Sequence, residues 1–203
     1  MHKIVIATRN RGKLAEFSRL LDDLPVEIFS LDEFEDIPEI EETGATFQEN
    51  AAVKARTVAD LTGLIAVADD SGLEVDALNG APGVYSARFA GEKSSDADNN
   101  AKLLKLLQGI PLPKRTARFR SVIAVALPGG ECYFAEGKCE GLIGLEPSGA
   151  NGFGYDPLFF LPSQKLTFAQ LSVEEKNKIS HRAKAVQGAK RILEQLLAKK
   201  NNR

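Results

Sequence analysis

The chain has 203 residues, 43% of them hydrophobic and 27% charged, with a formal net charge of −2. This length and apolar content fit one domain, or one domain with two lobes. No uninterrupted apolar run approaches the ~18 residues that suggest a membrane span, and the slightly acidic balance gives no global attraction to nucleic acid. We therefore expect neither a membrane nor a nucleic-acid polymer as a partner.

The ends of the chain and its cysteines indicate the compartment. The first apolar run is too short, and too soon broken by charges, for a signal peptide. Cys132 and Cys139 match no metal-ligand spacing, so we expect reduced thiols in a cytoplasmic protein. The Lys-rich end, Lys199–Arg203, is expected to be a disordered tail or a solvated helix end.

A strand and a polar loop open the chain. Residues 3–8 are strand-like, and the helical spacing of apolar residues from Leu14 predicts a helix that ends near Asp22. Between them, Thr8–Lys13 has three cations in six residues. Free backbone N–H groups and the positive end of the helix dipole favour an anion there. The loop is a candidate phosphate site, although a solvated basic turn would have the same composition.

A second strand, an acidic connector and a long helix follow. The strand covers residues 26–31, and the connector, 32–42, contains no lysine or arginine. A capping-box pattern begins the helix over 46–61. Asn50 and Lys54 are four residues apart and share one face near the helix start. Lys54 could reach a phosphate from there, or could be an ordinary surface lysine.

The most informative stretch is an apolar run that ends at two carboxylates. Residues 64–68 read as a strand buried on both faces, and Asp70–Gly72 reads as a turn at the carboxyl end of the run. Ligands bind at that end in α/β proteins. Adjacent carboxylates there indicate a divalent metal, a general base, or both, although aspartate, serine and glycine are also ordinary turn residues.

The middle of the chain predicts a mixed sheet. Residues 84–89 are expected to form either an irregular segment or a short helical turn, and Asp96 is the expected N-cap for a helix through Leu107. Residues 116–127 and 131–145 are strand-like and are separated by a Pro-Gly-Gly hairpin signal. A long antiparallel hairpin after strand–helix units argues against a purely parallel sheet.

The last third of the chain adds groups that could bind a ring. The glycines of residues 149–157 allow close backbone approach to a ligand, and Phe153 or Tyr155 could stack on a base, although an aromatic-anchored loop is the alternative. A capped short helix contains Lys176. His181-Arg182 begins the final helix, where cationic groups oppose the dipole preference, so an anionic or acceptor-rich ligand would suit that position.

These motifs, taken together and in this order, resemble those of the inosine triphosphate pyrophosphatase family over nearly the whole chain. Arg9 is a modest departure, since small or polar residues are common there in the family. The motifs that carry the resemblance are Thr8–Lys13, Glu41–Gly44, Phe47 with Glu49–Ala51 and Lys54-Ala55, Ala68–Leu73, Gly80–Gly83 with Ser86–Arg88, Phe153–Pro157, and Ser180–Arg182.

The resemblance implies an α/β fold with an elongated mixed β-sheet flanked by helices. It implies a single domain over residues 1–203 with two lobes around a central cleft, and a homodimer. The implied activity is Mg²⁺-dependent hydrolysis of the purine nucleoside triphosphates ITP, dITP and XTP to the monophosphate and pyrophosphate. This would prevent their incorporation into DNA and RNA.

The resemblance also implies roles for individual residues. Asp70 would be the catalytic carboxylate, and Glu41 and Asp70 would hold the metal. Because strand side chains alternate, only one of the two adjacent aspartates is expected in the site, so Asp69 is expected to be a structural residue beneath the turn. The substrate would be bound by Thr8, Arg9, Asn10, Arg11, Gly12, Lys13 and Lys54 at the phosphates, and by Ser71, Phe153, Gly154, Tyr155, Asp156, Lys176, His181 and Arg182 elsewhere on the nucleotide, the last two near the base.

Two alternative functions stay open. One is a related pyrophosphatase acting on modified pyrimidine nucleotides or dTTP. The other is a nucleotide-binding sensor that does not hydrolyse its ligand. The presence of Glu41 and Asp70 argues against this sensor.

Because strand side chains alternate, the side chains of Asp69 and Asp70 should point apart if the extended geometry of the strand persists to its end.

Overall fold

The fold is built on one mixed sheet, seen in a computed structural model that describes residues 2–35 and 37–201. The strand order is β2-β1-β3-β4-β5-β6-β7. Pairing is parallel between β1 and both β2 and β3, and antiparallel in β5-β6-β7. The mixed α/β fold class is therefore confirmed. The strands are β1 (His2–Ile6), β2 (Val26–Ser30), β3 (Ile65–Val75), β4 (Thr116–Ala126), β5 (Cys132–Ile143), β6 (Phe159–Leu161) and β7 (Leu166–Thr167).

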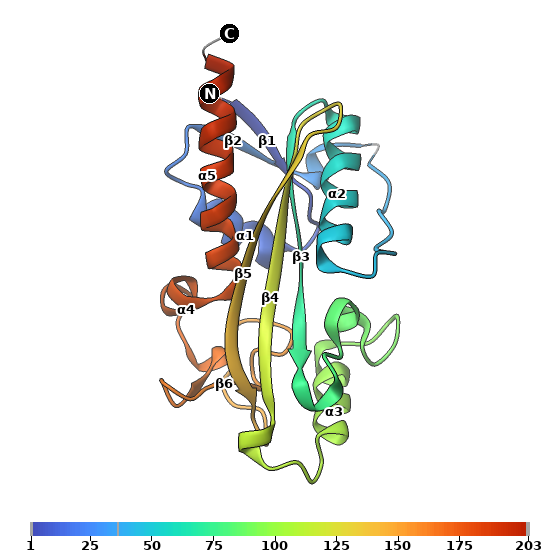
Figure 1. The fold of residues 1–203 in the computed structure, drawn as a ribbon, viewed down its shortest axis with the longest axis vertical. Helices are drawn as coiled ribbons and strands as arrows, with labels where there is room; N and C mark the ends of the chain where they lie inside the picture. The colour runs from blue at the N-terminus through green and yellow to red at the C-terminus, as the bar shows by residue number, and fades with distance from the viewer. Residues whose placement is uncertain (1, 36, 202–203) are drawn as a thin grey trace. The chain divides into compact units, whose positions relative to one another are not determined.

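Five α-helices accompany the strands in the described part of the chain (Figure 1). None of them is long and apolar enough to cross a membrane. Helix α5 ends at Asn201, and the last two residues of the expected Lys-rich tail, Asn202 and Arg203, lie outside the described residues. The helices are α1 (Arg11–Leu20), α2 (Phe47–Thr62), α3 (Asp96–Leu106), α4 (Val173–Ile179) and α5 (His181–Asn201).

The chain divides into two compact units. Unit 1 comprises Met1–Asp70, Ser121–Gly137 and Arg182–Arg203, and unit 2 comprises Ser71–Arg120 and Lys138–His181. The predicted cleft between two lobes stays a prediction.

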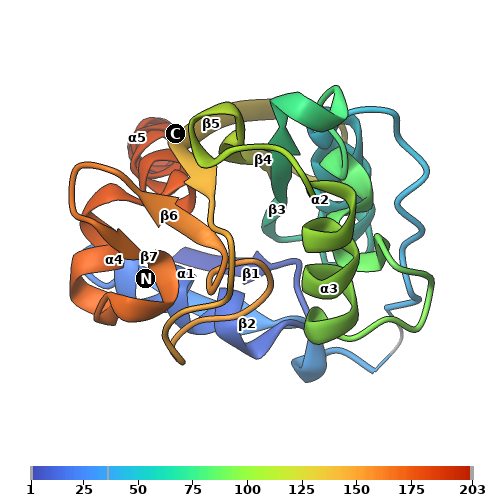
Figure 2. The same cartoon turned by 90° about the horizontal axis from the view of Figure 1, so that it is seen from below.

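Unit 1 has helices on both faces of its strands. Apolar side chains of α1 and α5, including Phe17 and Leu193, form one buried cluster with Ile4, Ile6 and Val67 of the strands. Helix α2 lies on the opposite face (Figures 1 and 2). The buried residues of α2 include four alanines, Ala51, Ala52, Ala55 and Ala59.

Unit 2 has a core of aromatic and branched side chains. Leu103 and Leu107 at the end of α3 are fully buried among residues of the strands and of the segment after β5. Phe119, Phe159 and Phe168 contact one another, with ring centroids 4.5–5.7 Å apart. Phe159 of this cluster lies just after the glycine-rich loop, residues 149–157, so the cluster anchors one end of that loop in the core of unit 2.

The predicted turn at Asp70–Gly72 is wrong, because β3 continues through these residues to Val75. Leu73 and Val75 are fully buried while Glu74 is half-buried, so the alternation of a strand persists beyond the carboxylates. Asp69 and Asp70 can lie inside a strand because each has polar partners on its own face.

The predicted caps are mostly confirmed. Thr46 and Glu49 form the capping box of α2, and Gly63 ends that helix with φ +67°. Residues 84–89 fall mostly in a short 3₁₀ helix, Gly83–Arg88. The N-cap of α3 is Ser95, not Asp96, because Ser95 and Asp98 form a capping box that places Asp96 at the first helical position.

Candidate active site

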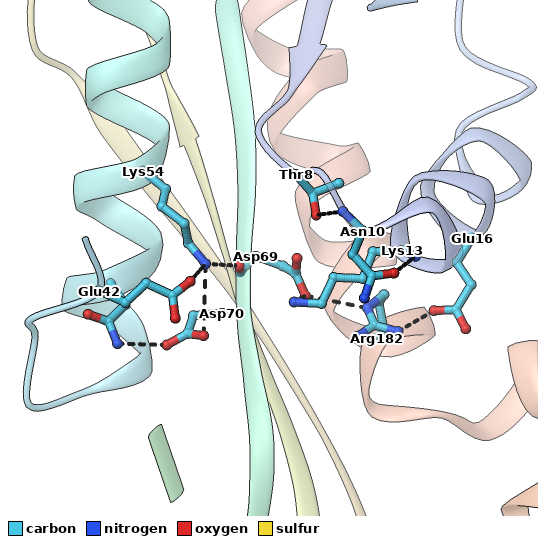
Figure 3. Close-up of polar contacts among 10 residues, drawn as sticks. Thr8, Asn10, Lys13, Glu16, Glu42, Lys54, Asp69, Asp70 and Arg182 are labelled. Atoms are coloured by element: carbon cyan, nitrogen blue, oxygen red, sulfur yellow. Dashed lines mark hydrogen bonds and ion pairs between the residues drawn. The ribbon is translucent and has the colours of Figure 1, made fainter. Parts of the chain in front are cut away.

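Asp69 and Asp70 are neighbours in β3, and their side chains point to opposite sides of the strand (Figure 3). Extended backbone geometry imposes this alternation on adjacent residues. Asp69 is 2% exposed and Asp70 is 4% exposed, so both carboxylates need polar partners. The expectation that they point apart is confirmed, and each has its own set of partners.

Asp70 faces the first turns of α2. Asn50 donates from Nδ2 to Asp70 Oδ2 over 3.0 Å, and its Oδ1 accepts the backbone N–H of Gly44 at 2.7 Å. Burial raises the pKa of Asp70, and the charge of Glu42 adds to this, while Lys54 and Asn50 offset only part. A carboxylate with a raised pKa accepts a proton more readily than an ordinary aspartate, which suits a general base.

Lys54 is the cation on the same side of the strand. Its Nζ lies 3.9 Å from Asp70 Oδ1 and 2.5 Å from Glu42 Oε1, and donates to the backbone oxygen of Asp69 at 2.7 Å. Burial favours the neutral form of Lys54, but the surrounding carboxylates outweigh it and raise its pKa. Lys54 is therefore a largely buried cation, not a solvated surface lysine.

The acidic connector contributes Glu42, not Glu41, to these contacts. Glu41 is exposed, and within the described residues no hydrogen bond or ion pair joins it to Asp70 or Lys54. The two residues expected to hold the metal, Glu41 and Asp70, therefore make no direct contact with each other. Glu42 is half-buried and committed to Lys54, whereas the Glu41 carboxylate is left to solvent.

Asp69 binds cations on the other side of β3. Lys13 Nζ lies 3.1 Å from Asp69 Oδ2, and Arg182 Nε donates to the same oxygen over 3.4 Å. Arg182 also donates from Nη1 to Glu16 (Figure 3). Burial alone would raise the pKa of Asp69, but Lys13, Arg182 and Lys54 together lower it. Asp69 is therefore an ionised carboxylate in a strand, not a residue beneath a turn.

The loop before α1 is more tightly bonded than the sequence predicts. Asn10 caps α1 and accepts the backbone N–H of Lys13 at 3.0 Å, and Thr8 Oγ1 accepts the N–H of Asn10 at 3.2 Å. Burial lowers the pKa of Lys13, with Asp69 offsetting part of the effect. The N–H of Lys13 is thus engaged within the loop, while Arg11 and Gly12 are exposed at the start of α1.

Arg9 is turned toward the acidic connector. Its guanidinium donates to the carbonyl of Ile37 at 2.9 Å and lies 3.6 Å from Asp32. The structure therefore brings Lys13, but not Arg9, to Asp69.

In unit 2, the segment Phe153–Asp156 is held by the side-chain carboxylate of its last residue, Asp156. Asp156 Oδ2 accepts the backbone N–H of Phe153 at 3.0 Å and the Lys176 ammonium at 2.6 Å. Gly152 has φ +78°, and a Cβ there would collide with the Asp156 carboxylate. Lys176 also lies 5.1 Å from the centre of the Phe153 ring, a cation–π distance.

Only one of the two aromatic candidates is accessible. Tyr155 is 4% exposed, and its hydroxyl donates to the Ser86 carbonyl at 2.7 Å. Burial raises the pKa of Tyr155 and the negative charge of Asp96 adds to it. Phe153 is half-buried, so it is the better candidate for stacking on a base.

His181 and Arg182 begin α5, as predicted, and both are buried. The His181 ring stacks on Phe119, with centroids 4.8 Å apart and an interplanar angle of 17°. Arg182 belongs to unit 1 and is held by the two carboxylates described above. Ser71, the residue after Asp70, is half-buried in β3.

Sequence reasoning did not assign a role to Glu16, Glu42 or Asn50. Glu16 lies three residues after Lys13 in α1, a spacing that gives no signal beyond a helix face. The sequence does not distinguish Glu42 from the other acidic residues of the connector, 32–42. Asn50 was placed on the Lys54 face, but its hydrogen bond to Asp70 depends on the packing of α2 against β3.

The fold and this arrangement define an α/β protein with an ionised Asp69, a more weakly acidic Asp70 and two half-buried lysines around one strand. A family model described as "Ham1 family" matches residues 4–192. Proteins called "dITP/XTP pyrophosphatase" are 57% identical in Desulforamulus reducens, over 96% of both chains, and 54% identical in Geobacter sulfurreducens, over 92% of this chain and 94% of that one. The chain belongs to the Ham1 family.

A solved structure of a family member agrees with the fold. The HAM1 protein from Coxiella burnetii has a TM-score of 0.89 and 46% sequence identity. The likeness covers 96% of this chain and the whole of that one. The fold described above is therefore shared with a solved HAM1 protein.

Proposed function

We propose that this chain is a nucleoside-triphosphate pyrophosphatase that hydrolyses dITP, ITP and XTP to the monophosphate and pyrophosphate. The observation that carries the proposal is Asp70, a buried carboxylate of raised pKa beside Lys54 and Asn50. The relatives named dITP/XTP pyrophosphatase support the substrate class.

The chemistry follows from the protonation states. Asp70 takes a proton from a water, whose oxygen attacks the α-phosphorus as the bond to the α–β bridging oxygen breaks and pyrophosphate leaves. Lys54, a cation with a raised pKa, offsets charge on the phosphates. We assign Lys13 and the Thr8–Gly12 loop to the same phosphates, because a triphosphate needs several cations and donors.

The residues around Asp70 fit a Mg²⁺ ion that takes most of its ligands from substrate and water. No group of three or more potential metal ligands occurs among the described residues, but Mg²⁺ commonly uses one or two protein carboxylates. We assign Asp70 and Glu41, because Glu42 is committed to Lys54. When bound, the ion would neutralise phosphate charge and lower the pKa of a bound water.

Base selection can be derived from hydrogen-bond complementarity. Hypoxanthine and xanthine carry an acceptor oxygen at position 6, whereas adenine carries an amino donor. We propose that His181 or Arg182 donates to this oxygen, and that Ser71, Asp156 and Lys176 bind elsewhere on the nucleotide. A donor facing adenine's amine would leave a buried mismatch that costs about 1–3 kcal/mol.

The homodimer, the cytoplasmic location and the single two-lobed domain belong to the same proposal. They are implied by the resemblance that supports the activity. No nucleic-acid polymer or membrane is needed as a partner for this chemistry.

Replacing Asp70 tests the catalytic assignment. The Asp70→Asn variant keeps the hydrogen-bonding shape but loses the base, so we expect pyrophosphate release from dITP to fall by about 10²-fold or more with a nearly unchanged melting temperature. Asp60→Asn, an exposed aspartate in the last turn of α2, is the matched control and should keep the wild-type rate. Wild-type turnover by Asp70→Asn would refute the assignment.

The metal assignment is tested by comparing two neighbouring glutamates. Glu41→Gln should raise the Mg²⁺ concentration needed for half-maximal activity and weaken Mg²⁺ binding measured by calorimetry. Glu42→Gln should leave Mg²⁺ binding closer to wild type, because Glu42 serves Lys54. The reverse order of effects would exchange the two roles.

A further inference from the structure

We propose that Asp96 and Asn100 of α3 are positioning residues that hold Gly154, and thereby present Phe153 to the substrate base. The role deepens the proposed function and rests on it, since the base is the expected partner of Phe153. Neither residue was singled out for the chemistry of the site.

The two side chains bind both polar groups of one residue. Asp96 Oδ2 accepts the backbone N–H of Gly154 at 2.7 Å, and Asn100 Nδ2 donates to the Gly154 carbonyl at 2.9 Å. Gly154 has φ +61°, a left-handed conformation that glycine adopts without strain. Because residues four apart share a helix face, one face of α3 holds the N–H and C=O of Gly154 together.

The orientation of the Asn100 amide is fixed by its partner. A flipped amide would bring its oxygen against the Gly154 carbonyl oxygen, so Nδ2 must be the contacting atom. Asn100 is 9% exposed, and its Oδ1 has no hydrogen-bond partner among the described residues. A negative charge at this position would therefore repel Gly154 instead of holding it.

Asp96 and Asn100, here called the clamp, act at the centre of the segment Phe153–Asp156, which other hydrogen bonds already hold on both sides. Phe153 N–H and Lys176 bind Asp156, and the Tyr155 hydroxyl binds the Ser86 carbonyl. Gly154 is the remaining backbone unit between them, and it directly follows Phe153. Releasing it would free the Phe153 ring to rotate away from its place beside Lys176.

Helix α3 is a rigid base for such a clamp. Leu103 and Leu107 are fully buried, and Ser95 and Asp98 cap its first turn. The neighbouring Asn99 holds a different segment, donating to the Ala87 carbonyl at 3.1 Å and accepting the Ala90 N–H at 2.7 Å. Asn99 is thus a buried asparagine of the same helix whose hydrogen bonds go to a segment other than Gly154.

The test compares Asn100→Ala with Asn99→Ala by steady-state kinetics on dITP and dATP. Asn100→Ala should raise KM for dITP up to about tenfold, the upper range for one hydrogen bond, with kcat within about twofold of wild type. The ratio of kcat/KM for dITP over dATP should fall. Asn100→Asp should be worse than Asn100→Ala, whereas Asn99→Ala should lower the melting temperature without changing KM or the ratio.

Asp96 offers a conservative rescue. Asp96→Asn keeps an oxygen that can accept the Gly154 N–H and should behave nearly as wild type, while Asp96→Ala should match Asn100→Ala. Equal KM values in Asn100→Ala and Asn99→Ala, or in Asp96→Asn and Asp96→Ala, would overturn the proposal.

Hydrogen exchange separates this inference from the proposed function. The Gly154 amide should exchange faster in Asp96→Ala than in Asp96→Asn, and unchanged exchange would overturn the clamp. If the wild-type chain released no pyrophosphate from any nucleotide, the proposed function would fail, and exchange at Gly154 would still decide whether the clamp exists.

Discussion

At the scale of single residues, two adjacent aspartates carry opposite perturbations. Lysine and arginine lower the pKa of Asp69, whereas burial and Glu42 raise that of Asp70. One backbone step separates them, but β3 turns them to different partners. Environments that push two pKa values apart often distinguish acid–base roles, which is why Asp70 is the better base and Asp69 the better anchor for cations.

Removing Arg182 tests the anchor role of Asp69. Arg182→Ala removes a buried cation shared by Asp69 and Glu16 and leaves Lys13 beside Asp69, so we expect a loss of about 3–5 kcal/mol in the free energy of unfolding, measured by urea denaturation. Arg191→Ala, an exposed arginine of the same helix, is the control and should stay within about 0.5 kcal/mol of wild type. Equal stabilities of the two variants would show that the ion pairs around Asp69 contribute little.

The roles of individual residues were predicted unevenly from the sequence. The alternation of a strand was enough to separate Asp69 from Asp70. It could not show that Glu42 contacts Lys54 and Glu41 does not, because the connector has no periodic pattern that fixes which carboxylate turns inward. The Arg182–Glu16 pair joins residues 166 positions apart, and no local signal predicts such a contact.

At the scale of elements, α2 carries two side chains that contact Asp70, those of Asn50 and Lys54. Its start is fixed by the capping box of Thr46 and Glu49, and its end by Gly63. These local signals position Asn50 and Lys54 one turn apart on the buried face. They are short-range in sequence, which explains why the helix was predicted nearly to the residue.

Removing the cap should weaken this helix. Thr46→Ala leaves the Glu49 N–H without its acceptor, and we expect a loss of about 1 kcal/mol of stability together with a lower rate of pyrophosphate release. Urea unfolding measures the first effect. Gln48→Ala, an exposed change in the same first turn, should have little effect, and a cap variant as stable as this control would contradict the account.

Strand β3 shows where local signals mislead. Asp-Ser-Gly is typical of turns, but the strand continues because Asn50, Lys54, Lys13 and Arg182 satisfy the carboxylates. All four come from other elements, so tertiary contacts override the local preference. The one-residue error at the α3 cap has a local cause, since serine and aspartate are both good N-caps and Ser95 forms the capping box with Asp98.

At the scale of the whole molecule, the fold class followed from the order of elements. Strand–helix units followed by a hairpin predicted a mixed sheet, which is what the seven strands form. Two compact units share the chain, with Asp70 the last residue of one segment and Ser71 the first of the next. The phosphate-binding candidates Lys13 and Lys54 belong to unit 1, and the base-binding candidate Phe153 belongs to unit 2.

The most direct test of the central claim is product release by the wild-type chain across a panel of nucleotides, with and without Mg²⁺. We expect pyrophosphate, not orthophosphate, from dITP, ITP and XTP in the presence of Mg²⁺, and at least about tenfold lower kcat/KM for dATP, as one buried mismatch would produce. Preference for dTTP or a modified pyrimidine nucleotide, or tight binding of dITP without turnover, would contradict it.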